Sequence, residues 1–80
     1  MQEIQVRLFA AARAAAKTDE LRVAPGSVAE ILRLCGKGNV ELQRVLPQCS
    51  VLIDGLACHD HQIVVAPGSQ VDVLPRFAGG

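Results

Sequence analysis

Apolar and polar residues alternate at several places along the chain, and this period of two predicts β-strands. In the first of them Ile4, Val6 and Leu8 are separated by polar residues, so one side is expected to face a core. The predicted strands cover residues 4–9, 20–23, 50–53, a short stretch after residue 55, and 71–74. Residues 63–65 are interpreted as an extension of the sheet edge.

Turn residues mark where these strands reverse or end. Asp54-Gly55 favours a type I′ hairpin, because both central residues of that turn need positive φ. Pro67-Gly68 indicates a second turn. Pro75 is expected to end the last strand because proline cannot donate to a ladder.

One substantial amphipathic helix is predicted between the second and third strands. Ser27 and Glu30 have the spacing of a capping box, which satisfies two amides at a helix start. The apolar stripe that follows recurs every three or four residues, at Val28, Ile31, Leu32 and Cys35. Gly36 and Gly38 then favour the end of the helix.

The order of these elements is strand, strand, helix, strand, strand, strand, with short helical turns at 10–17 and from a cap at Asn39 to Pro47. This order predicts an α+β protein of the β-grasp (ubiquitin-like) fold, a mixed sheet of about five strands with one main helix on one face. The first and last strands would run parallel at its centre. We assign residues 1–75 to this domain and residues 76–80 to a flexible C-terminal tail.

Length and charge narrow the functions open to the chain. Its 80 residues make one domain with a modest core, and that core must be aliphatic because Phe9 and Phe77 are the only aromatic residues. The formal net charge is zero, so nucleic acid and membranes are not expected partners. Three cysteines without CxxC spacing argue against a disulfide framework and indicate reduced thiols in the cytoplasm.

The run Cys58-His59-Asp60-His61 holds four side chains that can ligate a transition metal. In a strand His59 and His61 share one face while Cys58 points to the other, so one ion would not collect all four. A solvated loop is therefore the preferred interpretation, and we assign no metal site. Catalytic machinery is not expected either, because the sequence holds neither a Ser-His-Asp set nor a GxxxxGK loop.

The sequence ends at Arg76-Phe77-Ala78-Gly79-Gly80, soon after the last predicted strand. An α-carboxylate is ionised at neutral pH and is a poor acyl donor until it attacks the α-phosphate of ATP. Two residues without Cβ can thread a narrow channel and leave the carbonyl carbon open to a sulfur nucleophile. We interpret Gly80, with Gly79, as the reactive end of a carrier whose product is a thiocarboxylate. A frayed tail is the alternative.

Several stretches together resemble one known family. They are residues 8–13 (LFAAAR), 27–32 (SVAEIL), the Asp54-Gly55 hairpin, 67–75 (PGSQVDVLP) and the final Ala78-Gly79-Gly80. These look like the MoaD-type small subunits of molybdopterin synthase, in the MoaD/ThiS family of ubiquitin-like sulfur carriers. Members often have two prolines where this chain has Pro75-Arg76, and Phe77 replaces a smaller residue.

The resemblance implies a non-catalytic, sulfur-donating subunit without a bound cofactor. An adenylating enzyme of the ubiquitin-activating type would use ATP and Mg to form an acyl adenylate at Gly80, and a sulfur donor protein would convert it to a thiocarboxylate. The tail would then enter the large subunit of molybdopterin synthase and give sulfur to the precursor of the molybdenum cofactor. A thiamine-type carrier, a ubiquitin-like modifier joined through Gly80, and a binding module remain alternatives.

Leu74, Pro75, Arg76, Phe77 and Ala78 are the expected partner-binding residues. A chain that is half apolar leaves some apolar surface outside its core, so the exposed face of the sheet near Leu74 and Phe77 is expected to meet a partner. The tail from Arg76 onward is expected to become ordered only in a complex, because ordering glycine costs the most entropy.

Overall fold

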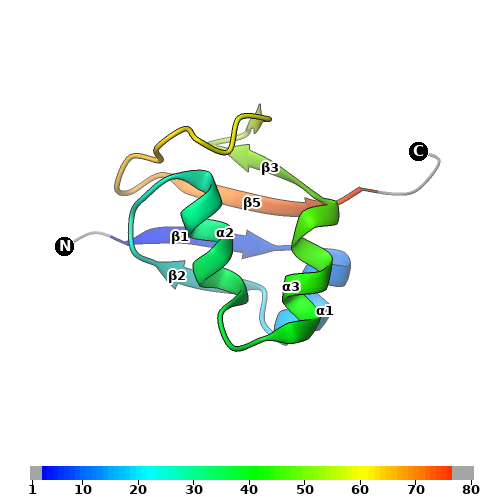
Figure 1. Cartoon of the computed structure of the whole chain (residues 1–80). Helices are drawn as coiled ribbons and strands as arrows, with labels where there is room; N and C mark the ends of the chain where they lie inside the picture. Colours follow the sequence, from blue (N-terminus) through cyan, green and yellow to red (C-terminus); the bar gives the residue numbers. More distant parts are fainter. Residues whose placement is uncertain (1–2, 77–80) are drawn as a thin grey trace.

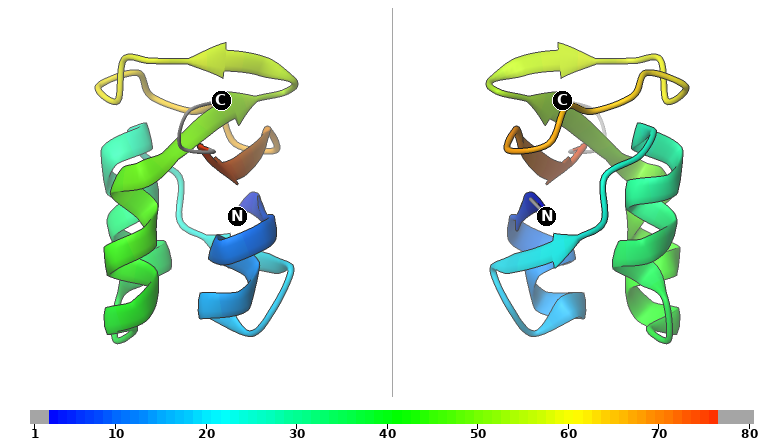
Figure 2. Two further views of the ribbon diagram at one scale, coloured as in Figure 1. Left: turned by 90° about the vertical axis from the view of Figure 1, so that its right-hand side faces the viewer. Right: turned by 90° about the vertical axis from the view of Figure 1, so that its left-hand side faces the viewer.

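The chain folds into two layers, a five-stranded sheet and the helices that pack against one of its faces (Figures 1 and 2). The structure is a computed structural model that describes residues 3–76. Its strands are β1 (Ile4–Leu8), β2 (Glu20–Val23), β3 (Cys49–Ile53), β4 (Leu56–Cys58) and β5 (Gln70–Pro75). Its helices are α1 (Ala10–Ala16), α2 (Val28–Gly36) and α3 (Val40–Val45), followed by the 3₁₀ turn η1 (Leu46–Gln48).

The sheet has the strand order β2-β1-β5-β3-β4. The central strands β1 and β5 are parallel, with Val6 opposite Val71, and the other neighbouring pairs are antiparallel. This order confirms the predicted mixed sheet with its first and last strands paired at the centre. The end of β5 at Pro75 also agrees with the prediction.

Helix α2 is the predicted main helix, and its capping box is present. The Ser27 hydroxyl accepts from the Glu30 N–H at 3.2 Å, and the Glu30 carboxylate accepts from the Ser27 N–H at 3.1 Å. Two further first-turn amides donate to a distant loop, Val28 to the Ile63 carbonyl and Ala29 to the His61 carbonyl, both at 2.9 Å. These four bonds satisfy groups that an α-helix leaves without internal partners.

The loop bonds to α2 explain why one strand prediction was wrong. Residues 63–65 form a single isolated bridge, Val64 to Ser27, and do not extend the sheet edge. Their backbone groups are instead paired with the start of α2 and with Gly26, whose carbonyl accepts from the Val65 N–H at 2.9 Å. The alternation of apolar residues is genuine, because Val65 is buried while Val64 is 72% exposed. The segment is therefore hydrogen-bonded to the start of a helix and not to a strand of the sheet.

The β3–β4 hairpin confirms the predicted type I′ turn. Asp54 has a φ of 49° and Gly55 a φ of 86°, so both central residues are left-handed. Ile53 pairs with Leu56 directly across the turn. The Asp54 carboxylate also accepts from the Gln70 N–H at 2.9 Å, which ties the hairpin to the start of β5.

The short helix predicted after Asn39 is present as α3. The Asn39 side chain accepts from the Leu42 N–H at 3.0 Å, as expected for a cap, and its amide nitrogen donates to the Ala15 carbonyl of α1 at 3.0 Å. Pro47 does not close the helical segment as predicted. It lies inside η1, near the start of that turn, where the missing N–H costs no helical hydrogen bond.

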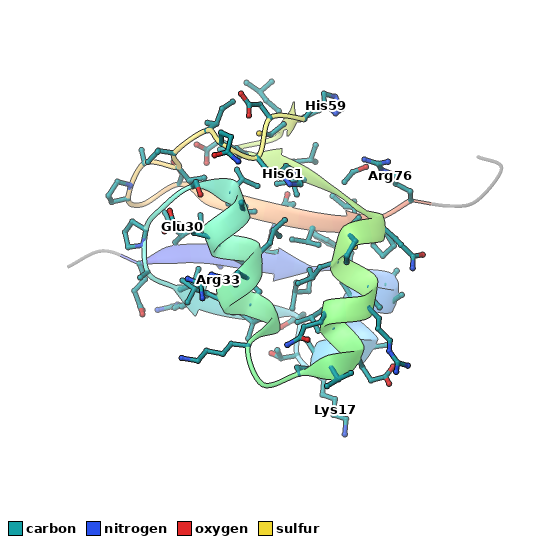
Figure 3. The ribbon with its side chains drawn as sticks, in the orientation of Figure 1. Lys17, Glu30, Arg33, His59, His61 and Arg76 are labelled. Atoms are coloured by element: carbon teal, nitrogen blue, oxygen red, sulfur yellow. The ribbon has the colours of Figure 1, made fainter. Side chains whose placement is uncertain are left out.

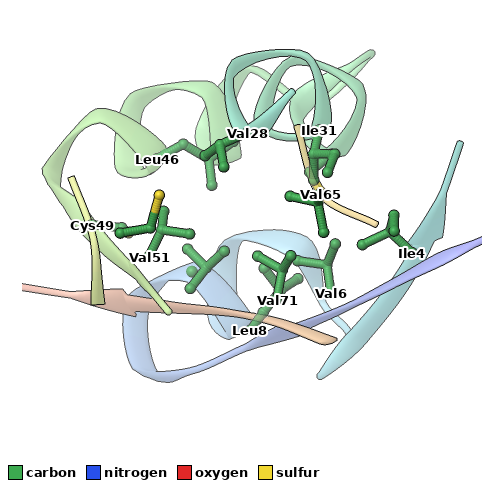
Figure 4. Close-up of a cluster of buried hydrophobic side chains, with 14 of the residues drawn as sticks. Ile4, Val6, Leu8, Val28, Ile31, Leu46, Cys49, Val51, Val65 and Val71 are labelled. Atoms are coloured by element: carbon green, nitrogen blue, oxygen red, sulfur yellow. The ribbon is translucent and has the colours of Figure 1, made fainter. Parts of the chain in front are cut away.

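Aliphatic side chains from both layers meet in one core (Figure 4). The inward residues of β1 and β5 are almost completely buried, and Ile31 of α2 packs over them with no exposed surface. Cys35 is part of this core, as its place on the apolar stripe predicts, and burial raises the pKa of its thiol to about 11. The Cys35 thiol therefore stays protonated and unreactive at neutral pH.

Candidate functional site

The face of the sheet turned away from α2 and α3, the open face, carries the outward residues of β1, β2, β3 and β5. Alternation along the strands places Gln5, Arg7, Glu20, Arg22, Ser50, Leu52, Gln70, Asp72 and Leu74 on it. The polar members lie mainly on β2, β1 and the first half of β5. The half-buried Leu52 and Leu74 mark a more apolar part near the end of β5.

An ion pair joins the two central strands on the open face. The Arg7 guanidinium donates to both carboxylate oxygens of Asp72, from Nε at 2.9 Å and from Nη2 at 3.1 Å. Gln70 donates to the same carboxylate at 3.1 Å. Asp72 is only 8% exposed, and the Arg7 guanidinium also lies 5.7 Å from the ring centroid of Phe9. The pair therefore fixes Arg7 between a carboxylate and an aromatic ring.

The hydrogen bonds from Arg7 are the main cause that lowers the pKa of Asp72, and burial opposes them. Asp72→Asn is expected to lower the free energy of unfolding at neutral pH by about 1 to 3 kcal/mol, the usual cost of losing charge-assisted hydrogen bonds. Because the folded-state pKa is depressed, this stability is present above the unfolded value of about 3.9 and is lost as the pH falls through the folded value.

Urea unfolding at neutral pH and near pH 2.5 measures this effect, and the deficit of Asp72→Asn is expected to shrink in acid. Glu41→Gln is the matched control, because Glu41 and Arg44 form an ion pair whose side chains are 72% and 73% exposed. Such surface pairs contribute little. An Asp72→Asn deficit that is the same at both pH values would show that the ion pair does not supply the stability.

The end of β5 positions three of the predicted partner-binding residues. Leu74 and Pro75 are half-buried, and Arg76 is exposed just beyond the strand. The Arg76 N–H donates to the Gln48 carbonyl at 3.0 Å, and its Nε donates to the Ser50 hydroxyl at 3.3 Å. The chain is therefore held to β3 up to Arg76. The predicted Phe77, Ala78, Gly79 and Gly80 lie outside the described residues.

Two buried cysteines lie near this end of the sheet. Burial raises the pKa of the Cys49 thiol, and the positive charge of Arg76 partly opposes that rise. The Cys58 thiol donates to the Asp60 carbonyl at 3.3 Å, so it faces its own loop. His59 and His61 are exposed. Within residues 3–76, no three His, Cys, Asp or Glu side chains gather in a way that could hold a metal ion.

The sheet order, the parallel central pair and the helical layer define the β-grasp fold of ubiquitin-like proteins. The solution structure of small archaeal modifier protein 1 (SAMP1) from Methanosarcina acetivorans matches with a TM-score of 0.85 and 24% identity, over 100% of this chain and 98% of that chain. The crystal structure of SAMP1 from Haloferax volcanii matches with a TM-score of 0.82 and 22% identity, over 98% and 99%.

A third match is a protein–protein complex of subunits 1 and 2 of molybdopterin-converting factor from Helicobacter pylori. Its TM-score is 0.72 at 18% identity, and it covers 98% of this chain and 99% of that chain. No protein-family model matches the sequence, and a search of curated proteins finds no match. At these identities the solved structures establish the fold, and the predicted β-grasp architecture is confirmed.

The sequence interpretation missed the Arg7–Asp72 pair. A signal was available, since Asp72 interrupts the apolar run of the last strand and Arg7 occupies the outward position of the first. What could not be read from the sequence was the register that places the two residues directly opposite each other. That register depends on a pairing between the two ends of the described chain.

Within residues 3–76, no helix is long and apolar enough to cross a membrane.

Proposed function

We propose that this chain is a ubiquitin-like sulfur carrier that serves as the small subunit of a molybdopterin synthase. The observation that carries the proposal is the way in which the central strand β5 runs directly into the segment that ends in Gly79-Gly80. Arg76 is anchored to β3 through the Ser50 hydroxyl, and four residues separate it from the carboxylate of Gly80 on which the proposal depends. At about 3.3 to 3.6 Å per residue, the Gly80 carboxylate can reach at most about 14 Å beyond Arg76.

A short reach suits a carrier whose chemistry takes place in its partners. The Gly80 carboxylate would attack the α-phosphate of ATP in an adenylating enzyme, with pyrophosphate as the leaving group and Mg neutralising charge. A persulfide on a sulfur donor protein would then attack the carbonyl carbon and displace AMP. A thiol would cleave the S–S bond of the resulting acyl disulfide, leaving a thiocarboxylate at Gly80 and a disulfide on the donor. The thiocarboxylate would pass its sulfur to a substrate in the large subunit, and water would restore the carboxylate. Gly79 and Gly80 would allow both enzymes to enclose the reacting carbon.

The likeness to the Helicobacter pylori complex supports a partner of the large-subunit kind. Leu74 and Pro75 at the end of β5 offer such a partner a half-buried apolar contact beside the tail. The likeness to SAMP1 supports a second candidate, a modifier that is joined through Gly80 to lysine side chains. Both roles begin with activation of the same carboxylate and differ in the nucleophile that follows.

Intact mass distinguishes the two candidates. The purified chain would be incubated with an adenylating enzyme of the ubiquitin-activating type, ATP, Mg and a sulfide source. A carrier is expected to gain about 16 Da, the exchange of oxygen for sulfur at a free Gly80 carboxylate. A modifier is expected to appear instead in larger, thiol-resistant conjugates. A chain whose mass stays that of the free acid, with no conjugates, would contradict both roles.

A further inference from the structure

One edge of the sheet is left incomplete where β4 stops. β3 pairs with β5 along its whole length, from Cys49 to Ile53, but with β4 only from Val51 to Ile53. The chain leaves the sheet after Cys58, because its continuation is fixed to α2 through the His61 carbonyl. The beginning of β3 therefore has a strand on one side only.

A cavity of about 350 Å³ occupies this position. We call it the edge pocket, and it is lined by Cys49, Ser50, Cys58, His59, His61 and Arg76 together with the neighbouring side chains of β3 and β4. Figure 3 shows His59, His61 and Arg76 around the beginning of β3 and the end of β4. The pocket lies directly beside the residue from which the tail departs.

One backbone acceptor beside this pocket, the Cys49 carbonyl, has no donor among residues 3–76. The Arg76 N–H donates to Gln48, so the next pair, Cys49 with Pro75, is a non-hydrogen-bonded pair whose backbone groups point away from β5. The Cys49 N–H donates to the Leu46 carbonyl. For the Cys49 carbonyl, however, the described residues supply no donor. Cys49 as a whole residue is only 4% exposed, and a backbone carbonyl without a partner in a buried residue is uncommon in folded proteins.

The residues that line the edge pocket bring one formal charge, the positive charge of Arg76. Arg76, His59 and His61 line it, and no Asp or Glu is among its lining residues. The carboxylate between the two histidines in the sequence, Asp60, accepts from the Gln62 N–H at 2.9 Å. Arg76 donates only to the Ser50 hydroxyl among side chains of the described part, so its guanidinium keeps donors that a carboxylate can use.

We propose that the edge pocket docks an extended, acidic segment of a partner protein. The segment adds to the outer edge of β3 as a strand, donates a backbone N–H to the Cys49 carbonyl, and presents a carboxylate to Arg76 and the two histidines. Leu52 and Ala57 beside the pocket supply apolar contact for an alternate side chain. The proposal does not require the sulfur-carrier role. Because the edge pocket lies beside Arg76, one partner would be able to bind both the outer edge of β3 and the C-terminal tail.

The test is a titration of the isotope-labelled chain with a short peptide of glutamate, valine and serine. Two matched peptides accompany it, one with lysine in place of glutamate and one with N-methylated backbone amides. The acidic peptide is expected to shift the Cys49 carbonyl carbon and the amides of Val51, Cys58 and His61. The lysine peptide and the N-methylated peptide are each expected to bind about tenfold more weakly, because each loses one of the two recognised features.

Variants locate the site. His59→Glu and His61→Glu are expected to weaken the acidic peptide about tenfold when combined, whereas Arg22→Glu on the opposite edge strand β2 should leave its affinity unchanged. Amide spectra of each variant confirm that the fold is kept. Equal binding of the three peptides, no binding, or shifts confined to the open face would overturn the proposal.

A chain that ends at Arg76 tests whether the protein's own tail is the occupant. If the acidic peptide binds only after residues 77–80 are removed, the pocket belongs to the tail and the proposal is wrong. The titration uses neither an activating enzyme nor ATP. A negative result therefore leaves the sulfur-carrier proposal standing, and failure of sulfur loading leaves the docking result unaffected.

Discussion

Deleting Gly80, or adding one residue after it, is expected to abolish adenylation and sulfur loading while the free energy of unfolding changes by less than about 0.5 kcal/mol. The described fold is complete without these residues, since β5 ends at Pro75 and the last anchoring hydrogen bonds belong to Arg76. The chemistry, in contrast, needs a free carboxylate on a residue without a side chain.

ATP–pyrophosphate exchange by the activating enzyme, followed by intact mass, measures both steps for each tail variant. Gly79→Val is expected to behave nearly like the deletion, because a β-branched residue excludes positive φ and widens the tail. Gly38→Ala serves as a control. Gly38 follows α2 with a φ of 75°, and an added methyl group would meet no atom within 4 Å, so the change should cost some stability but no sulfur loading. If a chain extended beyond Gly80 still acquires sulfur without being trimmed, the assignment of Gly80 is wrong.

Ile31→Ala is expected to lower the free energy of unfolding by about 2 to 5 kcal/mol, the range for removing a large buried aliphatic side chain. Ile31 has no exposed surface and joins α2 to the core beneath it. A domain of this size has a small core, so this loss is a large part of its total stability. It is expected to lower the melting temperature by roughly 10 °C or more.

Leu56→Ala is the matched control, because it removes a similar aliphatic side chain that is 75% exposed on β4. It should change the free energy of unfolding by less than about 0.5 kcal/mol. Chemical denaturation of both variants provides the comparison. Equal changes in the free energy of unfolding would mean that the contact between α2 and the sheet stabilises the protein no more than the exposed Leu56 side chain does.

Local signals in the sequence were sufficient wherever a short stretch of chain supplies its own partners. The capping box of Ser27 and Glu30, the Asn39 cap and the Asp54-Gly55 turn are each closed by groups a few residues apart, and all three are present. The apolar stripe of α2 and the inward residues of β1 and β5 were equally readable. Their periods of 3.6 and 2 are set by backbone geometry.

Residues 63–65 show where local signals fail. Their apolar alternation is compatible with a strand, but the choice between a sheet edge and a helix end depends on which distant backbone groups lack partners. The first-turn amides of α2 needed acceptors, and the carbonyls of His61 and Ile63 supply them. Only the folded chain brings these two segments together.

Apart from residues 63–65 and the position of Pro47, the sequence by itself determined the strands and main helices, their order, the aliphatic core and the Gly79-Gly80 ending on which the proposed function depends. The tertiary structure decided the rest, because each remaining feature joins residues far apart in the chain. It placed Arg7 opposite Asp72, which lies 65 residues away in the sequence. It also directs the loop after Cys58 away from β3 and toward α2. The sheet edge is incomplete beside the Cys49 carbonyl and the side chains of the edge pocket. The reason is that the residues after β4 are hydrogen-bonded to the start of helix α2 and do not continue the strand.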